Sequence, residues 1–251
     1  MTRHRRGIAF LILAPWLLAL LAWGISGLPD FGHLRGASGD LISATAPTER
    51  HVRNVVASVM FDHRALDTLG EEFMLFAAVA GTTLLLRPQR GEREGTPEEG
   101  RRQVPETSSA VRATALGLIG ITILLGIFIV LNGHLSPGGG FQGGIILATT
   151  WALVFLADEA RTFRRLTPVA VLEAIESGTA GGFLVVGLAG LLSGAGFLAN
   201  VLPLGRLGEL VSGGTIPALN LVVGIEVGTA FALLFYEFLH QALILRGSAR
   251  G

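Results

Sequence analysis

Long apolar runs without charged residues are the feature that most constrains this 251-residue sequence. A helix that crosses the hydrocarbon core of a bilayer needs about 20 mostly apolar residues at a rise of about 1.5 Å each. Long continuous runs of this kind do not fit the strands of a membrane barrel. The sequence therefore predicts an all-α integral membrane protein. Its six expected transmembrane helices are Ile8–Leu28, Leu69–Leu86, Ala113–Asn132, Phe141–Ala157, Glu176–Leu202 and Ile216–Leu239. The first run is too long for the apolar core of a signal peptide, which has roughly 7–15 residues, so we interpret it as an uncleaved span.

The arginines predict the orientation of these helices. All 19 basic residues are Arg, and 14 of them lie in the segments that six spans place on one side of the membrane. Because basic residues concentrate on the cytoplasmic side, both termini are expected in the cytoplasm, as an even number of spans requires. The multi-pass protein is therefore expected in the cell membrane.

Composition excludes several classes of protein. The chain has no Cys and no Lys, which excludes disulfides, thiolate metal sites, Schiff-base chemistry and a lysine proton carrier. Its formal net charge is +0, so no basic field indicates nucleic-acid binding. Because we find no catalytic, metal or dinucleotide motif, we expect no enzyme activity, no cofactor and no metal site.

A polar segment divides the chain in sequence. Residues 88–112 are charged and rich in Pro and Gly, which predicts a flexible cytoplasmic linker between a two-span module (1–87) and a four-span module (113–251). In the first module, residues 51–66 have apolar residues near helical spacing. They predict either a short amphipathic helix on the outer side or an ordered loop with apolar contacts.

Glu226 is the strongest single candidate for function. It lies ten residues after Ile216 and thirteen before Leu239, near the middle of the last span. An ionised side chain there costs about 2.5–3.5 kcal/mol on insertion scales, so such a residue faces protein or water. Either it takes part in transport, or it is a protonated carboxyl that bonds a neighbouring helix. Glu237, a further candidate for an ion path, falls on the same helix face about 16 Å away, so a relay between the two would need water or a partner. Taken alone, Glu237 is interpreted as an interface residue.

Other polar residues have more ordinary interpretations. Glu71 is a candidate for an ion path at the mouth of the second span, whereas for Glu72 a stabilising role at the helix start is favoured. Asp67 is expected to be the N-cap of that helix. Glu176, near Arg164 and Arg165, is interpreted with Glu173 as an interface pair or cap, and His134 as a solvated residue of an outer turn.

Glycines predict close packing and a tight turn. Small residues four apart let helices approach in lipid, which favours membership of a complex. These are the pairs Gly178/Gly182, Gly190/Gly194 and Gly224/Gly228. The turn Asn132–Gly144 contains Pro137 and three successive glycines, which cannot continue a helix and predict a compact hairpin between two spans. Coordination of an ion by that turn is the less favoured interpretation.

Two longer motifs resemble a known family. The stretch Asp62-His-Arg-Ala-Leu-Asp67-Thr-Leu-Gly-Glu71 resembles the N/D-x-R-x-x-D-T-L-G-E signature of Mrp-type multisubunit cation/proton antiporters. The later turn resembles the G-H-x-x-P-G-G-G-F-x-G-G motif of the MnhB domain, the family of the B-type subunit of those antiporters. Its matching residues are Gly133, His134, Pro137, Gly138, Gly139, Gly140, Phe141, Gly143 and Gly144. The resemblance covers residues 51–87 and 113–245.

The resemblance implies a subunit that exchanges Na⁺ for H⁺ together with other subunits in a prokaryotic plasma membrane. It places Glu71 near an ion path, and Glu226-Val-Gly228 stands where the family often has Asp-x-Gly. The lysine-based proton channels would belong to larger subunits. Two alternatives stay open: a purely structural membrane subunit, and a membrane-arm subunit of a redox complex such as complex I or a membrane-bound hydrogenase.

Overall fold

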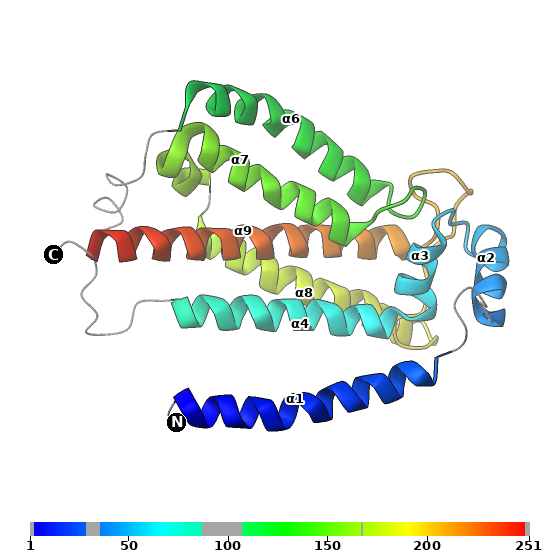
Figure 1. Cartoon of the computed structure of the whole chain (residues 1–251). Coiled ribbons are helices and arrows are strands. Elements are labelled where there is room, and N and C mark those ends of the chain that lie inside the picture. The colour runs from blue at the N-terminus through cyan, green and yellow to red at the C-terminus, as the bar shows by residue number, and fades with distance from the viewer. Residues whose placement is uncertain (1–2, 29–35, 87–106, 167, 249–251) are drawn as a thin grey trace. The chain divides into compact units, whose positions relative to one another are not determined.

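Helices make up all the regular structure in the part of the chain that the structure describes. The computed structural model describes residues 3–28, 36–86, 107–166 and 168–248 (Figure 1). The elements are α1 (Arg3–Ser26), α2 (Ala37–Glu49), α3 (Val55–Ser58), the π-helix η1 (Val59–His63), α4 (Ala65–Leu86), α6 (Ser109–Leu131), α7 (Gly140–Leu166), α8 (Val169–Leu192) and α9 (Ile216–Ser248). The predicted all-α class is confirmed.

Five of these helices are long and apolar enough to cross a membrane: α4, α6, the part Gly140–Ala157 of α7, α8, and the part Ile216–Ala242 of α9. In α1 the apolar part found among the described residues, Ala14–Ser26, is shorter. The sixth span and the cytoplasmic location of the termini therefore stay predictions. By packing, residues 1–40 and 41–251 form two separate units.

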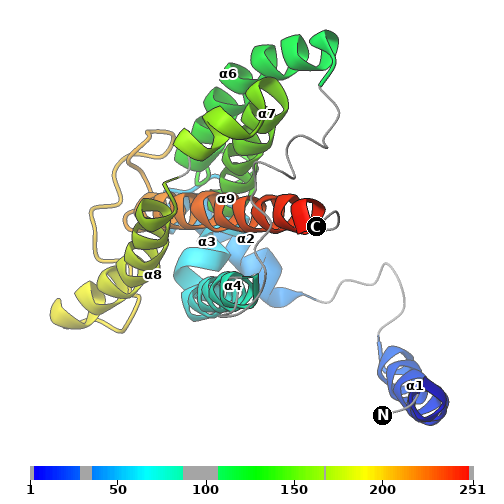
Figure 2. The same ribbon diagram turned by 90° about the vertical axis from the view of Figure 1, so that its left-hand side faces the viewer.

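The second unit is built around α9. This helix contacts α4, α6, α7 and α8. Two views show the α6/α7 pair on one side of α9, and α4 and α8 on the other (Figures 1 and 2). The predicted linker separates two modules in the sequence, but the helices on its two sides pack together, because α4 contacts α8 and α9. Residues 87–106 of that linker lie outside the described residues, and α6 begins at Ser109, just before its end.

The boundaries of α8 differ from the predicted span Glu176–Leu202. The helix starts at Val169, behind Pro168, and ends at Leu192. The prediction rested on a long uncharged run, and the first two turns of the helix contain the charged residues Glu173 and Glu176. The true start of the helix was therefore missed. It ends because the chain turns there, and Gly194 adopts a left-handed φ of 80°. The predicted pair Gly190/Gly194 is therefore not a stripe on one helix.

Glycines let α7 approach α9 closely. A Cβ on Gly144 would lie 2.8 Å from the carbonyl oxygen of Gly224, and one on Gly224 would lie 2.7 Å from a methyl carbon of Val130. A Cβ on Gly228 would lie 3.5 Å from the carbonyl oxygen of Gly144, in ordinary contact. The pair Gly224/Gly228 therefore packs within this chain. On α8, a Cβ on Gly182 would be in ordinary contact with α9, and one on Gly178 would meet open space.

We expect Gly144→Ala to separate α7 from α9 and to destabilise the fold by about 1–3 kcal/mol, as overpacking does in other cores. Gly120→Ala is the matched control, because a Cβ there meets nothing within 4 Å in the middle of α6. Both variants gain the same helix propensity. The thermal unfolding midpoint in detergent should fall only for Gly144→Ala, and equal midpoints for the two variants would contradict the close contact.

Candidate functional site

Three buried glutamates lie inside the membrane-spanning bundle. Glu72 of α4 and Glu226 of α9 are fully buried, and Glu176 of α8 is 4% exposed. Each lies on the face that its helix turns toward the bundle, and the opposite faces of α4 and α8 carry exposed apolar residues such as Met74 and Val185. Carboxyls are almost never fully buried unless they are paired, so this cluster needs an explanation.

The carboxyl groups interact with one another rather than with basic residues. Glu72 and Glu226 form a side-chain contact through their carboxyl groups. The geometry of that contact is loose, since none of their four oxygens has a well-formed hydrogen bond to a described atom. The charge of Glu226 also acts on Glu176, whose Oε1 atom has no partner among the described residues. Like charges in a water-poor interior repel, and this repulsion is relieved when neighbouring carboxyls share protons.

The three carboxyls lie at different depths. Glu72 follows the start of α4 by seven residues, about 10 Å along the axis. Glu226 follows the start of α9 by ten residues, about 15 Å. Helix α8 runs in the opposite direction, and Glu176 lies about 10 Å from its start, near the other end of the bundle (Figure 1). The order across the membrane is therefore Glu72, Glu226, Glu176.

The ion-path candidates that the sequence suggested occupy different positions around the line formed by Glu72, Glu226 and Glu176. Glu226 lies in the middle of that line. Glu71 is half-buried beside it, and its charge acts on Glu72. Glu237 is buried three turns further along α9. Asp67 is not the N-cap of its helix, because α4 starts at Ala65; it is exposed instead, and pairs with Arg64 at 2.5 Å.

Glu72 and Glu176 could not be selected from the sequence. Both lie near a helix start, where an acidic residue is ordinarily explained by the helix dipole. One sequence signal did point to Glu72: it lies four residues after Thr68, which places two polar side chains on one face of an apolar helix. In the structure both side chains are fully buried on that face of α4. For Glu176 the signal was obscured by the predicted start of its helix. The side chains of Arg164 and Arg165, its expected partners, lie outside the described residues.

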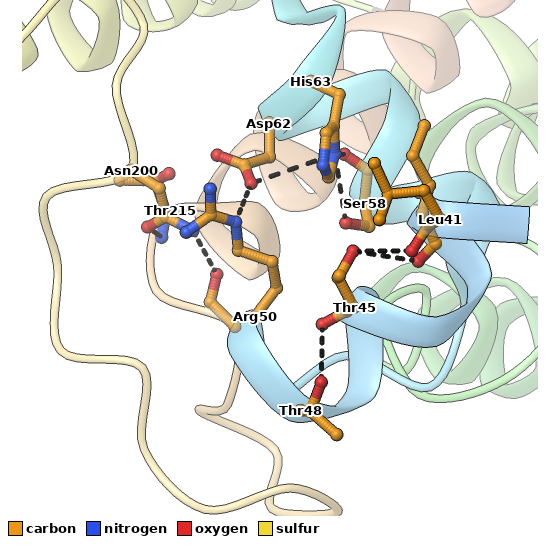
Figure 3. Close-up of polar contacts among 11 residues, drawn as sticks. Leu41, Thr45, Thr48, Arg50, Ser58, Asp62, His63, Asn200 and Thr215 are labelled. Carbon is orange, nitrogen blue, oxygen red and sulfur yellow. Dashed lines mark hydrogen bonds and ion pairs between the residues drawn. The ribbon is translucent and has the colours of Figure 1, made fainter. Parts of the chain in front are cut away.

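The two sequence motifs lie together at the outer end of the bundle, and Asn54, which precedes the first motif, bonds the second. Its side-chain Nδ2 donates to the carbonyl oxygens of Gly133, Ser136 and Gly138, while its Oδ1 caps α3. Beside it, Arg50 and Asp62 form an ion pair of 2.5 Å (Figure 3). The segment 51–66 is therefore a short helix followed by a π-helical turn that packs into the core, rather than a helix lying on the surface.

The outer turn itself is held by α9. The side-chain Oδ1 of Asn220 accepts from the backbone N–H of Gly140, where α7 begins. Just before this point Gly138 and Gly139 adopt left-handed φ angles of 121° and 151°, which other residues rarely adopt. The predicted compact hairpin between α6 and α7 is present.

His134 is not solvated, contrary to the sequence interpretation. It is fully buried, its Nε2–H donates to the backbone oxygen of Glu209 at 3.3 Å, and its own carbonyl accepts from Arg53 and Asn54. The outer loop before α9 covers it, which sequence alone did not indicate. Burial lowers the pKa of His134, and this effect outweighs the opposing effect of its hydrogen bond to Glu209.

We expect His134 to make the fold less stable in acid. With a lowered pKa in the folded state, the unfolded chain binds a proton that the folded chain does not, so the stabilisation is complete above the ordinary pKa of about 6.5 and is lost as pH falls below it. The unfolding midpoint of the wild type should drop between pH 7.5 and pH 5.5 by more than that of His134→Gln. Parallel pH profiles for the two proteins would contradict this role.

Comparison with known proteins identifies the family. The sequence pattern described as "domain related to MnhB subunit of Na+/H+ antiporter" matches residues 110–233. An uncharacterized protein of Methanocaldococcus jannaschii is 30% identical over 232 residues, which are 84% of this chain and 85% of that protein. The chain belongs to the MnhB-domain family. Within this family, the B-type subunit of the Na(+)/H(+) antiporter of Bacillus subtilis is 34% identical over 96 residues, 38% of this chain and 66% of that protein.

Two solved structures share the fold of this MnhB-domain protein. One belongs to the membrane-bound sulfane sulfur reductase, an archaeal respiratory membrane complex. Its matching chain has a TM-score of 0.71 and 31% identity, over 94% of this chain and 98% of that one. The other is the Mrp complex from Dietzia sp. DQ12-45-1b, with a TM-score of 0.67 and 22% identity over 96% of this chain. This protein spans about a quarter (26%) of that second chain.

Proposed function

We propose that this chain is a membrane subunit of a multisubunit monovalent cation/proton antiporter in a prokaryotic plasma membrane. The observation that carries the proposal is the line of three buried carboxyls across helices whose outer faces are apolar. Membership of the MnhB-domain family supports the antiporter class. The chain is then part of a transporter and not an enzyme by itself.

The carboxyls supply the chemistry that such a subunit needs. A buried carboxyl can hold a proton as a neutral group and release it as an anion, and its neighbour responds to that charge. Moving one elementary charge through the membrane potential is worth about 2.3 kcal/mol per 100 mV. Glu72, Glu226 and Glu176 are the central groups in this proposal, with Glu71 at the outer mouth and Glu237 deeper on α9.

Sister subunits are the expected partners. Exposed apolar residues cover the outer faces of α4, α6 and α8, and a Cβ on Gly178 would meet open space within this chain. Such faces fit either lipid or another transmembrane helix. Since this chain has no lysine, the lysine-based channels implied by the family resemblance belong to those partners.

A second candidate function is a membrane subunit of a respiratory redox complex. The observation that favours it is the match to the sulfane sulfur reductase chain, which extends over 98% of that chain. The two candidates assign this chain the same ion-conducting carboxyls and differ only in its partners. Purification of the native complex through a tag on this chain, followed by mass spectrometry, distinguishes them. Antiporter subunits alone support the first candidate, and co-purifying iron–sulfur or flavin subunits support the second.

We expect Glu226→Gln to assemble normally but to reduce the rate of cation/proton exchange at least about tenfold. This threshold is lower than the roughly hundredfold contribution that a positioned proton-transfer group makes to a reaction rate. The amide has nearly the same shape but cannot release a proton. Exchange is measured in proteoliposomes of the purified complex with a pH-sensitive dye. Glu209→Gln is the control, because its side chain is exposed in the outer loop.

Full exchange by Glu226→Gln would remove the carboxyl from the mechanism and favour a purely structural subunit. That third possibility has its own signature. Substitutions of the carboxyls by amides would all be silent, whereas a bulky residue at Gly178, where a Cβ meets open space within this chain, would disrupt the complex.

A further inference from the structure

A partly polar cavity reaches the innermost carboxyl. A hollow of about 300 Å³ lies between α4, α8 and α9, and its polar lining residues are Thr83, Glu173, Glu176 and Ser177. Thr83 is near the end of α4 and Glu173 is in the second turn of α8, so the hollow lies at the end of the bundle that the arginines predict to be cytoplasmic. A polar cavity needs only about 10–15 Å³ to hold a water, so this one has room for several.

Glu176 connects this cavity to the buried pair. Its side chain lines the hollow although it is only 4% exposed, and its Oε1 atom has no hydrogen-bond partner among the described residues. The same carboxyl interacts with the charge of Glu226. An orphaned buried oxygen at a polar cavity is the position where a water, or a group that brings a proton, restores the missing hydrogen bond.

A second, smaller cavity lies at the opposite end of the carboxyl line. It has a volume of about 150 Å³, and its lining includes Thr68, Asn220 and the backbone of Gly138–Gly140. Thr68 is one helical turn before Glu72 on the same buried face of α4. The two family motifs therefore converge on this cavity, and the three carboxyls lie between the two hollows.

The arrangement of the carboxyls in a row favours a proton over a metal cation. A metal cation that leaves water needs a shell of oxygen ligands in place of its hydration. The described residues contain no group of three or more acidic, His or Cys side chains that could hold a metal ion. The carboxyls are instead arranged one after another, which suits a proton because a single carboxyl or water can accept it.

We propose that Glu176, Glu226 and Glu72 form a proton path within this single chain, entered by water through the cavity between α4 and α8, and that metal cations do not follow it. This inference rests on the proposed function and adds the identity of the ion. A hydronium ion in the cavity protonates the Glu176 carboxylate and leaves a water. Glu176 then releases a proton that water relays to Glu226, Glu226 passes a proton to Glu72, and Glu72 releases one to water on the outer side, so that each donor becomes the anion that accepts the next proton. No electron transfer takes part.

Further carboxyls lie beside this path. Among the described residues, Glu71 of α4 acts on Glu72, Glu173 of α8 acts on Glu176, and Glu237 lies further along α9. Glu71 lies beside Glu72, the outermost residue of the path, and Glu173 lies near Glu176, the innermost residue.

The first experiment tests whether water fills the cavity. The natural chain has no Cys, so single cysteines can be labelled without background. In the assembled complex, Ser177→Cys should react with a membrane-impermeant maleimide, because a thiol reacts as the thiolate, which forms in water. Ile175→Cys, at the same depth but half a turn away on an exposed apolar face, is the control. No labelling of Ser177→Cys, or labelling equal to that of Ile175→Cys, would overturn the water-filled entrance.

The second experiment tests the identity of the ion. Reconstituted complexes with Glu176→Gln should exchange at least about tenfold more slowly at saturating Na⁺, while the Na⁺ concentration for half-maximal rate stays the same, and Glu176→Asp should restore part of the rate. A rise in that Na⁺ concentration with an unchanged maximal rate would instead make Glu176 a cation ligand and overturn the proposal. If the wild-type complex exchanges no cation at all, the proposed function fails; if it does and Glu176→Gln is silent, only the proton path fails.

Discussion

The burial of Glu226 in the middle of α9 is the constraint on which the rest of the fold depends. A carboxyl at that depth must face polar groups rather than lipid. Residues two apart on a helix point to nearly opposite sides. As a result Gly224 and Gly228 form a face of α9 that admits α6 and α7, while Glu226 faces α4 and α8, which bring Glu72 and Glu176. One helix thereby organises both sides of the bundle.

The outer end of the bundle is held by hydrogen bonds, and it fixes where α4 and α7 begin. Asn54 and Asn220 bond backbone groups of the glycine-rich turn, and His134 lies buried beneath the loop before α9. These contacts explain much of the two family motifs without a bound ion. They also place Thr68 and the glycines around a small cavity just outside Glu72. The motifs therefore shape the outer end of the row of carboxyls, next to Glu72, rather than forming a separate site.

Sequence predicted the helices well and the site only in part. Apolar runs of about 20 residues gave the helical class, and the mid-span carboxyl Glu226 could be selected because its cost in lipid is large. Glu72 and Glu176 could not, because their importance comes from which helices face α9, and a helix-start position has an ordinary explanation. His134 was misjudged for the same kind of reason: the loop that covers it comes about 75 residues later in the chain. Periodicity shows which residues share a face, but not which faces meet.

Infrared difference spectroscopy of the assembled complex tests the central claim most directly. If Glu226 and Glu72 share a proton at neutral pH, the spectrum contains a protonated-carboxyl stretching band that shifts in D₂O and disappears in both Glu226→Gln and Glu72→Gln. Loss of the band in both variants, with Glu209→Gln unchanged, is the result that we expect. A complex that lacks this band, or that keeps it in both variants, would contradict a proton held between α4 and α9.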